Sequence, residues 1–254
     1  RVQDYEKYLN REIENNQVAW QYLMRKQKAE EEAKNPYWLN LNLSLKDAVV
    51  KPVDRSLAKR IIEEYEWLGC MPAISKFQFG IFFDDVCGGV VVFGTEYIEN
   101  RGVWDKYGFT GKIILLSRGV CLHWTPKNTN SKLVMGAIKQ LPEQYEIVTA
   151  LVDRKAGEFG TIYQACNFYY VGVMRKSKKR NAFIIDNKLV NSRTLRAKYG
   201  TSNPKVIQEL VPDAKYVPQY SKERYFLFRK NKEQHLKAIE HLLKPYPKRN
   251  EGVK

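Results

Sequence analysis

The sequence predicts an α/β fold in which helices flank a mixed sheet. Residues 146–152 form a continuous apolar run of strand length, as expected for a strand that is covered on both faces. Residues 131–141 carry apolar side chains at helical spacing. Residues 77–84 and 88–94 are apolar runs joined by an Asp-Asp turn, which predicts an antiparallel hairpin. Helices that alternate with strands of both orientations indicate a layered α/β domain.

The N-terminal part is expected to be a helical extension. Residues 1–36 are polar and helix-prone with a loose apolar stripe, and Pro36 provides a stop. Packing against the body of the protein or a partner is the simplest role for such a helix. Residues 37–51 are predicted to be a linker and an edge strand. Asp54 is predicted to cap a helix that ends near Gly69.

The central part is predicted to bring polar residues to strand ends. A strand at 112–122 is interrupted by polar residues, and the strand at 146–152 ends at Asp153. A short helix at 161–166 and a strand at 167–174 follow. Asp153 and Tyr163 are therefore expected near the carboxyl end of a strand, where open α/β sheets bind their ligands.

The catalytic core is expected to span residues 37–175, and residues 176–254 a basic C-terminal appendage that contacts DNA. The predicted elements of this appendage are a hairpin around Asp186 and Asn187, helices at 193–199 and 204–210 on either side of Gly200, a strand at 224–228 and a helix at 233–243.

Composition limits the class of protein. The 43 basic and 28 acidic side chains give a net charge of +15, which favours polyanionic partners such as nucleic acid or an anionic cofactor. The four cysteines are far apart and include no CxxC pair, which argues against a disulfide framework and a thiolate zinc site. No apolar run reaches transmembrane length and no signal-peptide pattern opens the chain. We therefore expect a soluble, cytoplasmic protein without a membrane partner.

Tyr163 and Asp153 are candidate catalytic residues. A phenol titrates near pH 10, so Tyr163 can donate a proton to an anionic leaving group at neutral pH, or it can be a core tyrosine. Asp153 can accept a hydrogen bond from an exocyclic amine or act as a base. Capping of the next turn is the structural alternative for Asp153.

Arg118, Asn128 and Ser131 are candidates for binding an anionic group of a cofactor. Arg118 interrupts an apolar strand, and a buried guanidinium requires a partner, either an anionic donor or Asp153. Asn128 and Ser131 precede or open a helix, where backbone N–H groups attract anions. Simple N-capping explains these two residues equally well.

A metal site has little support in the sequence. Cys121 and His123 alternate on one strand, but no third ligand clusters with them. Iron remains an alternative cofactor only because the reaction can require chemistry that amino-acid side chains do not provide.

Basic residues after residue 174 are the candidate DNA contacts, although a charge run is often only a solvated face. They are Arg175, Lys176, Lys178, Lys179, Arg180, Arg193, Arg196 and Lys198.

The order helix, hairpin, strand, helix, strand, helix, strand resembles the acetyltransferase-like (GNAT) fold. A more detailed pattern resembles the Mom-type DNA-modification proteins of bacteriophages. The matching segments are Leu116-Ser117-Arg118, Asn128 to Ser131, Asp153, Gly160 to Ala165, Ser192 to Leu195, Tyr199 to Ser202, Lys222 to Tyr225 and Pro245 to Lys248. Two departures stand out: Glu66-Trp67 occupies the place of a frequent His-Tyr pair, and WTPKNTNS replaces the glycine-rich pyrophosphate loop.

The resemblance implies conversion of adenine N6 in duplex DNA to a carbamoylmethyl-type adduct, which protects phage DNA from restriction in the host cytoplasm. It also implies that Arg118, Ser131, Asp153 and Tyr163 form the active site. The group donor is open between acetyl-coenzyme A and a glycine-derived compound. Two other functions fit the residues: a coenzyme A-dependent acyltransferase acting on a small amine or protein, and a non-catalytic nucleic-acid-binding protein with the same fold.

Overall fold

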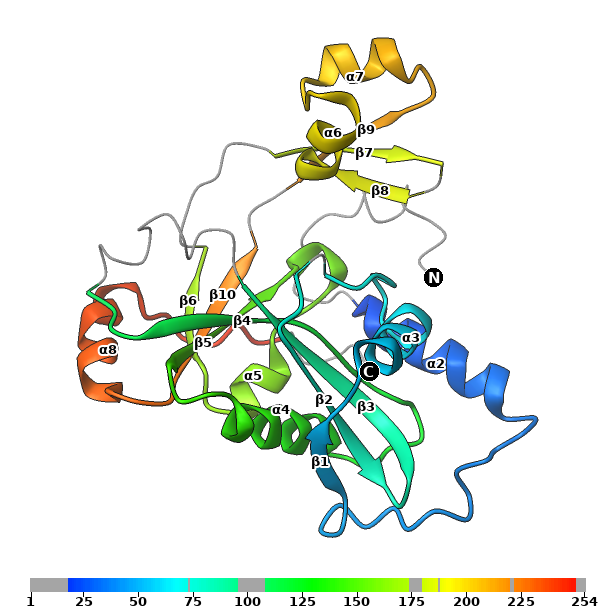
Figure 1. Cartoon of the computed structure of the whole chain (residues 1–254), viewed down its shortest axis with the longest axis vertical. Coiled ribbons are helices and arrows are strands. Elements are labelled where there is room, and N and C mark those ends of the chain that lie inside the picture. Colours follow the sequence, from blue (N-terminus) through cyan, green and yellow to red (C-terminus); the bar gives the residue numbers. More distant parts are fainter. Residues whose placement is uncertain are drawn as a thin grey trace.

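A seven-stranded mixed sheet forms the centre of the computed structural model (Figure 1). The structure describes residues 18–72, 74–95, 108–173, 180–186, 188–219 and 222–249. The sheet has the strand order β1-β2-β3-β4-β5-β10-β6. Its strands are β1 (Val49–Pro52), β2 (Phe77–Phe83), β3 (Val86–Gly94), β4 (Lys112–Cys121), β5 (Tyr145–Val152), β6 (Tyr169–Gly172) and β10 (Glu223–Phe228). Only β4 and β5 pair in parallel; the other neighbours are antiparallel.

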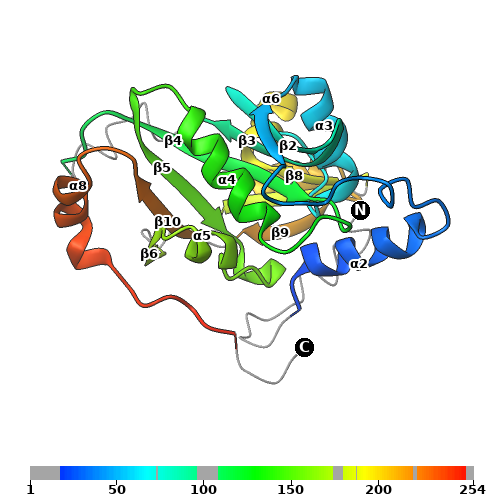
Figure 2. The ribbon, with the colours of Figure 1, turned by 90° about the horizontal axis from the view of Figure 1, so that it is seen from below.

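Helices cover both faces of this sheet, as Figures 1 and 2 show. The helices of the main body are α2 (Trp20–Glu32), α3 (Arg55–Tyr65), α4 (Thr129–Gln140), α5 (Thr161–Ala165) and α8 (Lys232–Ile239), with the 3-10 turns η3 (Arg154–Ala156) and η4 (Glu240–Leu242). β3 contacts both α3 and α4 and is buried from Gly88 to Gly94, as expected for a strand covered on both faces. The mixed sheet and its flanking helices confirm the α/β fold that the sequence predicts.

β10 shows how strand alternation divides the core. Tyr225 packs into the large cluster beneath α4 and α5, whereas Phe226 and Phe228 point to the other face and pack with Ile239 of α8. Successive side chains of a strand point to opposite faces, so one short strand contributes to two hydrophobic clusters.

The parallel strands β4 and β5 stop pairing partway along their length. Their register runs from Lys112 opposite Tyr145 to Leu116 opposite Ala150. Ser117 then forms a bulge, because Val92 of β3 pairs with Arg118 and Phe93 pairs with Leu116. Bulges bend the strand that carries them. Beyond Leu116, β4 continues beside β3 while β5 continues beside β10, so the sheet opens at the carboxyl ends of β4 and β5.

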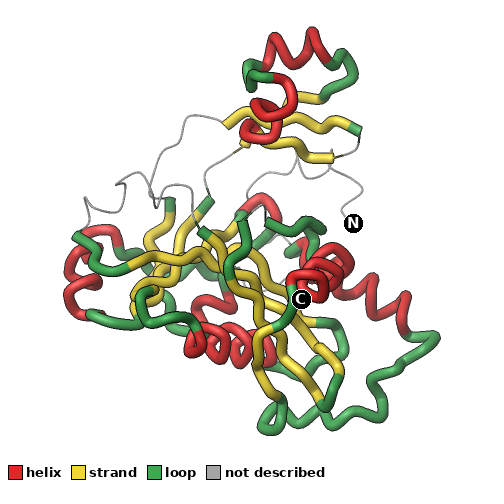
Figure 3. Tube along the Cα trace, viewed as in Figure 1, coloured by secondary structure: helices red, strands yellow, loops and turns green. Residues whose placement is uncertain are grey.

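A small α/β body follows β6, visible at the top of Figures 1 and 3. It contains the sheet β8-β7-β9 and two helices: β7 (Arg180–Ile185), β8 (Lys188–Asn191), α6 (Ser192–Tyr199), α7 (Pro204–Leu210) and β9 (Lys215–Gln219). Its own core contains Phe183, Ile185, Leu195, Ile207 and Ala214. The predicted hairpin and both helices are confirmed, whereas the third strand, β9, was not expected.

The C-terminal organisation differs from the predicted one. The appendage expected from residue 176 to residue 254 is interrupted, because β10 inserts between β5 and β6 of the main sheet. α8 packs on β10, and Tyr246 donates a hydrogen bond to the Phe168 carbonyl oxygen at 2.6 Å. The separate body is therefore an insertion between β6 and β10, described from residue 180 to residue 219. The change of composition after residue 174 marks the start of this insertion but gives no sign of the return to the core.

The N-terminal extension is described from residue 18, so the part of the predicted helix before it lies outside the described residues. α2 lies beside α3 (Figure 1), and its Arg25 reaches the carbonyl oxygen of Cys121 at the end of β4. Gln21 donates to the Tyr65 carbonyl at 2.8 Å and accepts from the Trp67 N–H at 2.9 Å. Arg25 donates to the His123 carbonyl oxygen at 2.7 Å. In the described ranges no helix is both long and apolar enough to cross a bilayer.

Candidate active site

Arg118 lies where β4 and β5 separate. It follows the bulge at Ser117, whose hydroxyl donates to the Val92 carbonyl at 3.0 Å. The half-buried guanidinium donates from Nε to the Cys70 carbonyl at 3.0 Å and from Nη1 to the Ser117 carbonyl at 2.7 Å. Arg118 thus joins β4 to the loop after α3, and its guanidinium has further donors for an anion.

Tyr163 is held on α5 by aromatic packing. Gly160, at φ +68°, starts this short helix. The Tyr163 ring lies 5.4 Å from the ring of Phe168 and 5.5 Å from that of Tyr225, measured between centroids. Burial, and then the charges of Glu158 and Glu66, raise the pKa of the phenol above its ordinary value. Tyr163 is therefore protonated at neutral pH and can donate a hydrogen bond or a proton.

Two buried carboxylates beside Tyr163 were not predicted from the sequence. Glu66 follows α3 and is 7% exposed, and its Oε2 accepts hydrogen bonds from the N–H groups of Leu68 and Gly69, each at 3.1 Å. Burial raises the pKa of Glu66 to about 7, although Arg118 opposes this shift. The one sign in the sequence was that Glu66-Trp67 stands where the resembling family often has a His-Tyr pair, and this was interpreted as a departure rather than as a site.

Glu158 is the second carboxylate. Its Oε1 accepts from the Trp67 indole N–H at 2.8 Å, and its Oε2 accepts from the Asp153 backbone N–H at 2.7 Å. Burial raises the pKa of Glu158, while Lys222 acts in the opposite direction. Hydrogen bonds hold both carboxylate oxygens of Glu158, so it positions its neighbours and has no oxygen left free to react.

Asp153 lies at the edge of this cluster and has the capping role that the sequence left open. Its Oδ1 accepts from the Lys155 N–H at 3.0 Å, which caps η3. Its Oδ2 lies 3.6 Å from Nζ of Lys222. Asp153 contacts the cluster through its backbone N–H, which donates to Glu158.

Asn128 and Ser131 lie at the start of α4. Asn128 is the N-cap residue at φ +71°, but its side chain makes no capping hydrogen bond. Ser131 is in the first turn, and Cys166 of α5 donates from Sγ to its carbonyl oxygen at 3.9 Å. Cys166 also donates its backbone N–H to the Tyr163 carbonyl oxygen at 3.2 Å, which links the Ser131 backbone to α5. That α4 binds an anion here remains a prediction.

The structure thus brings Arg118 and Tyr163 together with Glu66 and Glu158. We call these four residues the acidic cluster. Asp153 touches it through its backbone, and Ser131 approaches it through Cys166. The indole of Trp67, which donates to Glu158, meets Trp20 of α2 edge-on, with ring centroids 6.4 Å apart.

Cys121 and His123 do not form a shared ligand site. Cys121 is buried, which raises the pKa of its thiol. His123 pairs through Nε2 with Oε2 of Glu32 at 3.0 Å. Within the ranges that the structure describes, no three His, Cys, Asp or Glu residues gather at metal-binding distance.

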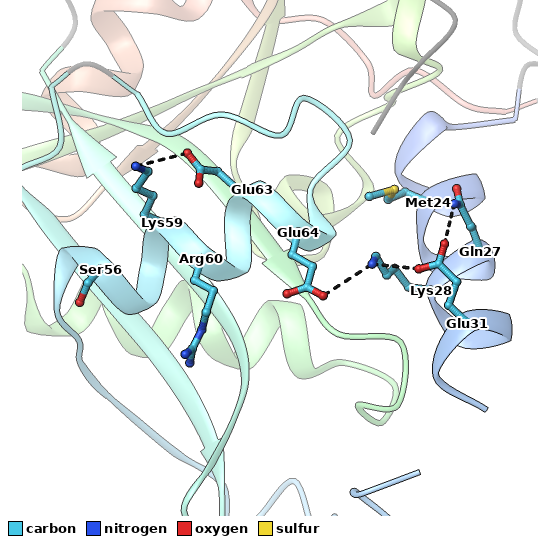
Figure 4. Close-up of a pocket in the computed structure, with 9 residues that line it drawn as sticks. All are labelled: Met24, Gln27, Lys28, Glu31, Ser56, Lys59, Arg60, Glu63 and Glu64. Atoms are coloured by element: carbon cyan, nitrogen blue, oxygen red, sulfur yellow. Dashed lines mark hydrogen bonds and ion pairs between the residues drawn. The ribbon is translucent and has the colours of Figure 1, made fainter. Parts of the chain in front are cut away.

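A groove of about 640 Å³ lies between α2 and α3, away from the acidic cluster (Figure 4). Its charges pair with one another: Lys28 reaches Glu31 at 2.9 Å and Glu64 at 3.6 Å. The groove is lined by Met24, Gln27, Lys28, Glu31, Ser56, Lys59, Arg60, Glu63 and Glu64.

The predicted DNA contacts lie in and before the small body. Arg175, Lys176, Lys178 and Lys179 fall outside the described residues. Arg180 opens β7, and Arg193, Arg196 and Lys198 belong to α6. The side chains of Arg196 and Lys198 are exposed, and Arg196 Nε donates to the Ser202 hydroxyl at 3.1 Å.

The fold and the candidate site thus define an α/β domain whose mixed sheet opens between the parallel strands β4 and β5, with polar side chains where they separate. Comparison with known families is more specific: the model of the Mom protein family matches residues 47–248, so the chain belongs to the Mom protein family. Residues 18–46, which include α2, lie outside the match. No curated protein matches the sequence.

Two solved structures are similar in outline. One is a dodecameric spermidine N-acetyltransferase from Vibrio cholerae, 9% identical, with a TM-score of 0.38 over 74% of this chain and 96% of that chain. The other is an agmatine N-acetyltransferase variant in its apo form, 10% identical, with a TM-score of 0.36 over 72% of this chain and all of that one. Similarity at this level does not transfer a substrate.

Proposed function

We propose that this protein modifies the N6 amino group of adenine in duplex DNA, converting it to a carbamoylmethyl-type adduct that protects phage DNA from restriction in the host cytoplasm. Membership of the Mom family supports DNA modification as the class of function. The observation that carries the proposal is the acidic cluster, which gathers Arg118, Tyr163 and two carboxylates where β4 and β5 separate.

The roles of the residues follow from their surroundings. Arg118 provides a fixed positive charge for an anionic donor. Tyr163 keeps its proton at neutral pH and can pass it to a leaving group. Asp153, through its backbone N–H, and Trp67 fix Glu158. Ser131 and Asn128 at the start of α4 are the proposed contacts for the donor, either acetyl-coenzyme A or a glycine-derived compound.

The positive charge of the small body and of the residues just before it favours DNA binding. Residues 175–219 carry 11 basic and 3 acidic side chains, a net of +8 out of +15 for the whole chain. Positive charge of this density attracts the phosphate backbone without reading sequence. An enzyme that acts on a base within a duplex must first extrude that base.

Expression in a bacterium followed by mass spectrometry of the DNA nucleosides tests the proposal. The expected result is a modified deoxyadenosine that is absent from cells without the protein and strongly reduced in cells that express Tyr163→Phe. Only ordinary deoxyadenosine from cells containing the folded protein would contradict it.

A coenzyme A-dependent acyltransferase acting on a small amine or protein is the second candidate. The separation of β4 and β5 beyond Leu116 favours it, because the backbone of β4 no longer pairs with β5 there. A thermal shift with acetyl-coenzyme A and no binding to DNA supports this candidate. Salt-sensitive DNA binding with unmodified nucleosides supports a non-catalytic binding protein instead.

A further inference from the structure

We propose that Glu66 is the catalytic base that accepts the N6 proton of adenine. The inference rests on the proposed function and adds a residue role to it. The exocyclic amine of adenine is a poor nucleophile because its lone pair is delocalised into the ring. Removal of a proton while the new bond forms therefore requires a base at the reacting nitrogen.

The geometry around Glu66 suits a base. Two backbone N–H groups hold Oε2, which fixes the orientation of the carboxylate. The other oxygen, Oε1, accepts no hydrogen bond from the residues that the structure describes. Glu66 therefore presents one held and one available oxygen.

The titratable groups that face Glu66 come from three parts of the chain. Arg118 of β4 favours its ionised form, whereas Glu158 disfavours it. Tyr163 of α5 contributes a protonated phenol to the same cluster. A carboxylate balanced between burial and a guanidinium can take up a proton at neutral pH and release it after turnover.

The other carboxylates of the site are less suitable. Glu158 already accepts one hydrogen bond on each oxygen, from Trp67 and Asp153. Asp153 caps η3 with Oδ1 and faces Lys222 with Oδ2. Proton acceptance by either residue would break a contact that shapes the loop, whereas proton acceptance by Oε1 of Glu66 breaks none.

The step balances with one acid and one base. The N6 nitrogen attacks the activated carbon of the donor, and the bond from that carbon to its leaving group breaks with its electron pair. The proton lost from N6 moves to Glu66, and the leaving group takes a proton from Tyr163. Proton exchange with water then returns Glu66 to its ionised form and Tyr163 to its protonated form. The donor is a compound with a leaving group on the transferred carbon.

The test compares Glu66→Gln with Glu66→His in cells and in vitro. Gln keeps the shape and the hydrogen-bond acceptor but cannot act as a base, whereas an imidazole can. We expect Glu66→Gln to lower the initial rate of adenine modification by roughly 100- to 10,000-fold and Glu66→His to restore part of it. Glu64→Gln, on the exposed side of α3, is the matched control and should modify DNA at the normal rate.

A pH profile adds a readout that a structural role would not change. The reaction uses a DNA duplex and clarified bacterial extract as the source of donor. The wild-type rate should fall below a pH near 7, and this dependence should be absent from the residual activity of Glu66→Gln. An unchanged rate and pH profile in folded Glu66→Gln would overturn the role of Glu66. Unmodified DNA from the wild type would instead overturn the proposed function. Should Glu66→Gln not fold, complete inactivity of a folded Glu66→His would count against the base.

Discussion

Glu66 has a measurable effect on stability because it is an acid with a raised pKa in a buried position. Burial raises this pKa to about 7, whereas glutamate in an unfolded chain titrates near pH 4. The folded protein therefore binds a proton that the unfolded chain has already lost between these pH values. Stability from this residue is present below about pH 4 and is lost as the pH rises through 7.

We therefore predict that Glu66→Gln becomes more stable than the wild type as the pH increases. The difference in unfolding free energy should grow between pH 4 and pH 8, by up to roughly 3 kcal/mol. Chemical denaturation at pH 5 and pH 8 measures it, with Glu64→Gln as the control. A constant difference across this range would contradict the assigned pKa.

Tyr163 permits a second prediction at the level of one residue. Tyr163→Phe removes the phenol oxygen but keeps the ring that packs on Phe168 and Tyr225. We expect the rate of adenine modification to fall by at least about 100-fold, because a positioned proton donor contributes at least this factor. DNA affinity and melting temperature should change little.

The control for Tyr163→Phe is Tyr169→Phe. Tyr169 lies on β6 and stacks on Phe228, away from the acidic cluster. A normal rate in both variants would show that the phenol of Tyr163 takes no part in the reaction. Quantitative mass spectrometry of nucleosides provides the measurement for both.

The turn before α5 depends on a glycine. Gly160 has φ +68°, and a Cβ added there would lie 2.6 Å from the ring of Tyr225, which is fully buried. We predict that Gly160→Ala destabilises the protein by about 2 kcal/mol or more, from backbone strain and overpacking together. Gly108 has φ +66°, and a Cβ added there would have no atom within 4 Å, so Gly108→Ala measures the backbone strain alone. Equal melting temperatures for the two variants would exclude the steric contribution.

α2 is attached to the core by polar contacts with backbone carbonyls. Arg25 donates to the carbonyl oxygens of Cys121, His123 and Thr125. We predict that Arg25→Ala lowers the unfolding free energy by about 1.5–3 kcal/mol, because the acceptors lose a charged donor. It should also speed cleavage by trypsin between residues 18 and 33. Lys26→Ala removes an exposed side chain of the same helix and should do neither. Equal cleavage rates would show that Arg25 does not fix α2.

Charge is a property of the whole molecule, and it predicts how DNA binding responds to salt. If the basic region neutralises about six phosphates, the affinity should fall roughly a thousandfold between 50 and 200 mM salt. The double substitution of Arg196 and Lys198 by Ala should reduce the logarithmic salt slope by about two. Replacement of Lys26 and Lys59 by Ala removes the same charge elsewhere and should leave the slope unchanged. Fluorescence anisotropy with a labelled duplex measures these slopes. An unaltered slope in the first variant would mean that α6 does not contact the backbone.

The sequence by itself determined the order of the secondary structure. Apolar runs, helical spacing and turn residues act over a few neighbours, so they predicted the hairpin β2–β3, the strand–helix–strand unit around Tyr163 and both helices of the small body. The local pattern around Arg118 and Tyr163 also predicted a site. These features depend on interactions between residues close in the chain, which a sequence displays directly.

Only the tertiary structure decided which distant residues meet. β10 returns to the main sheet after the insertion because its alternating side chains fill two cores, a fit that no local pattern records. Glu66 and Glu158 lie far apart in sequence, and their raised pKa values arise mainly from burial after folding, with repulsion from Glu158 adding to the shift of Glu66. Proximity and desolvation depend on the packed chain as a whole, so the acidic cluster is visible only once that packing is known.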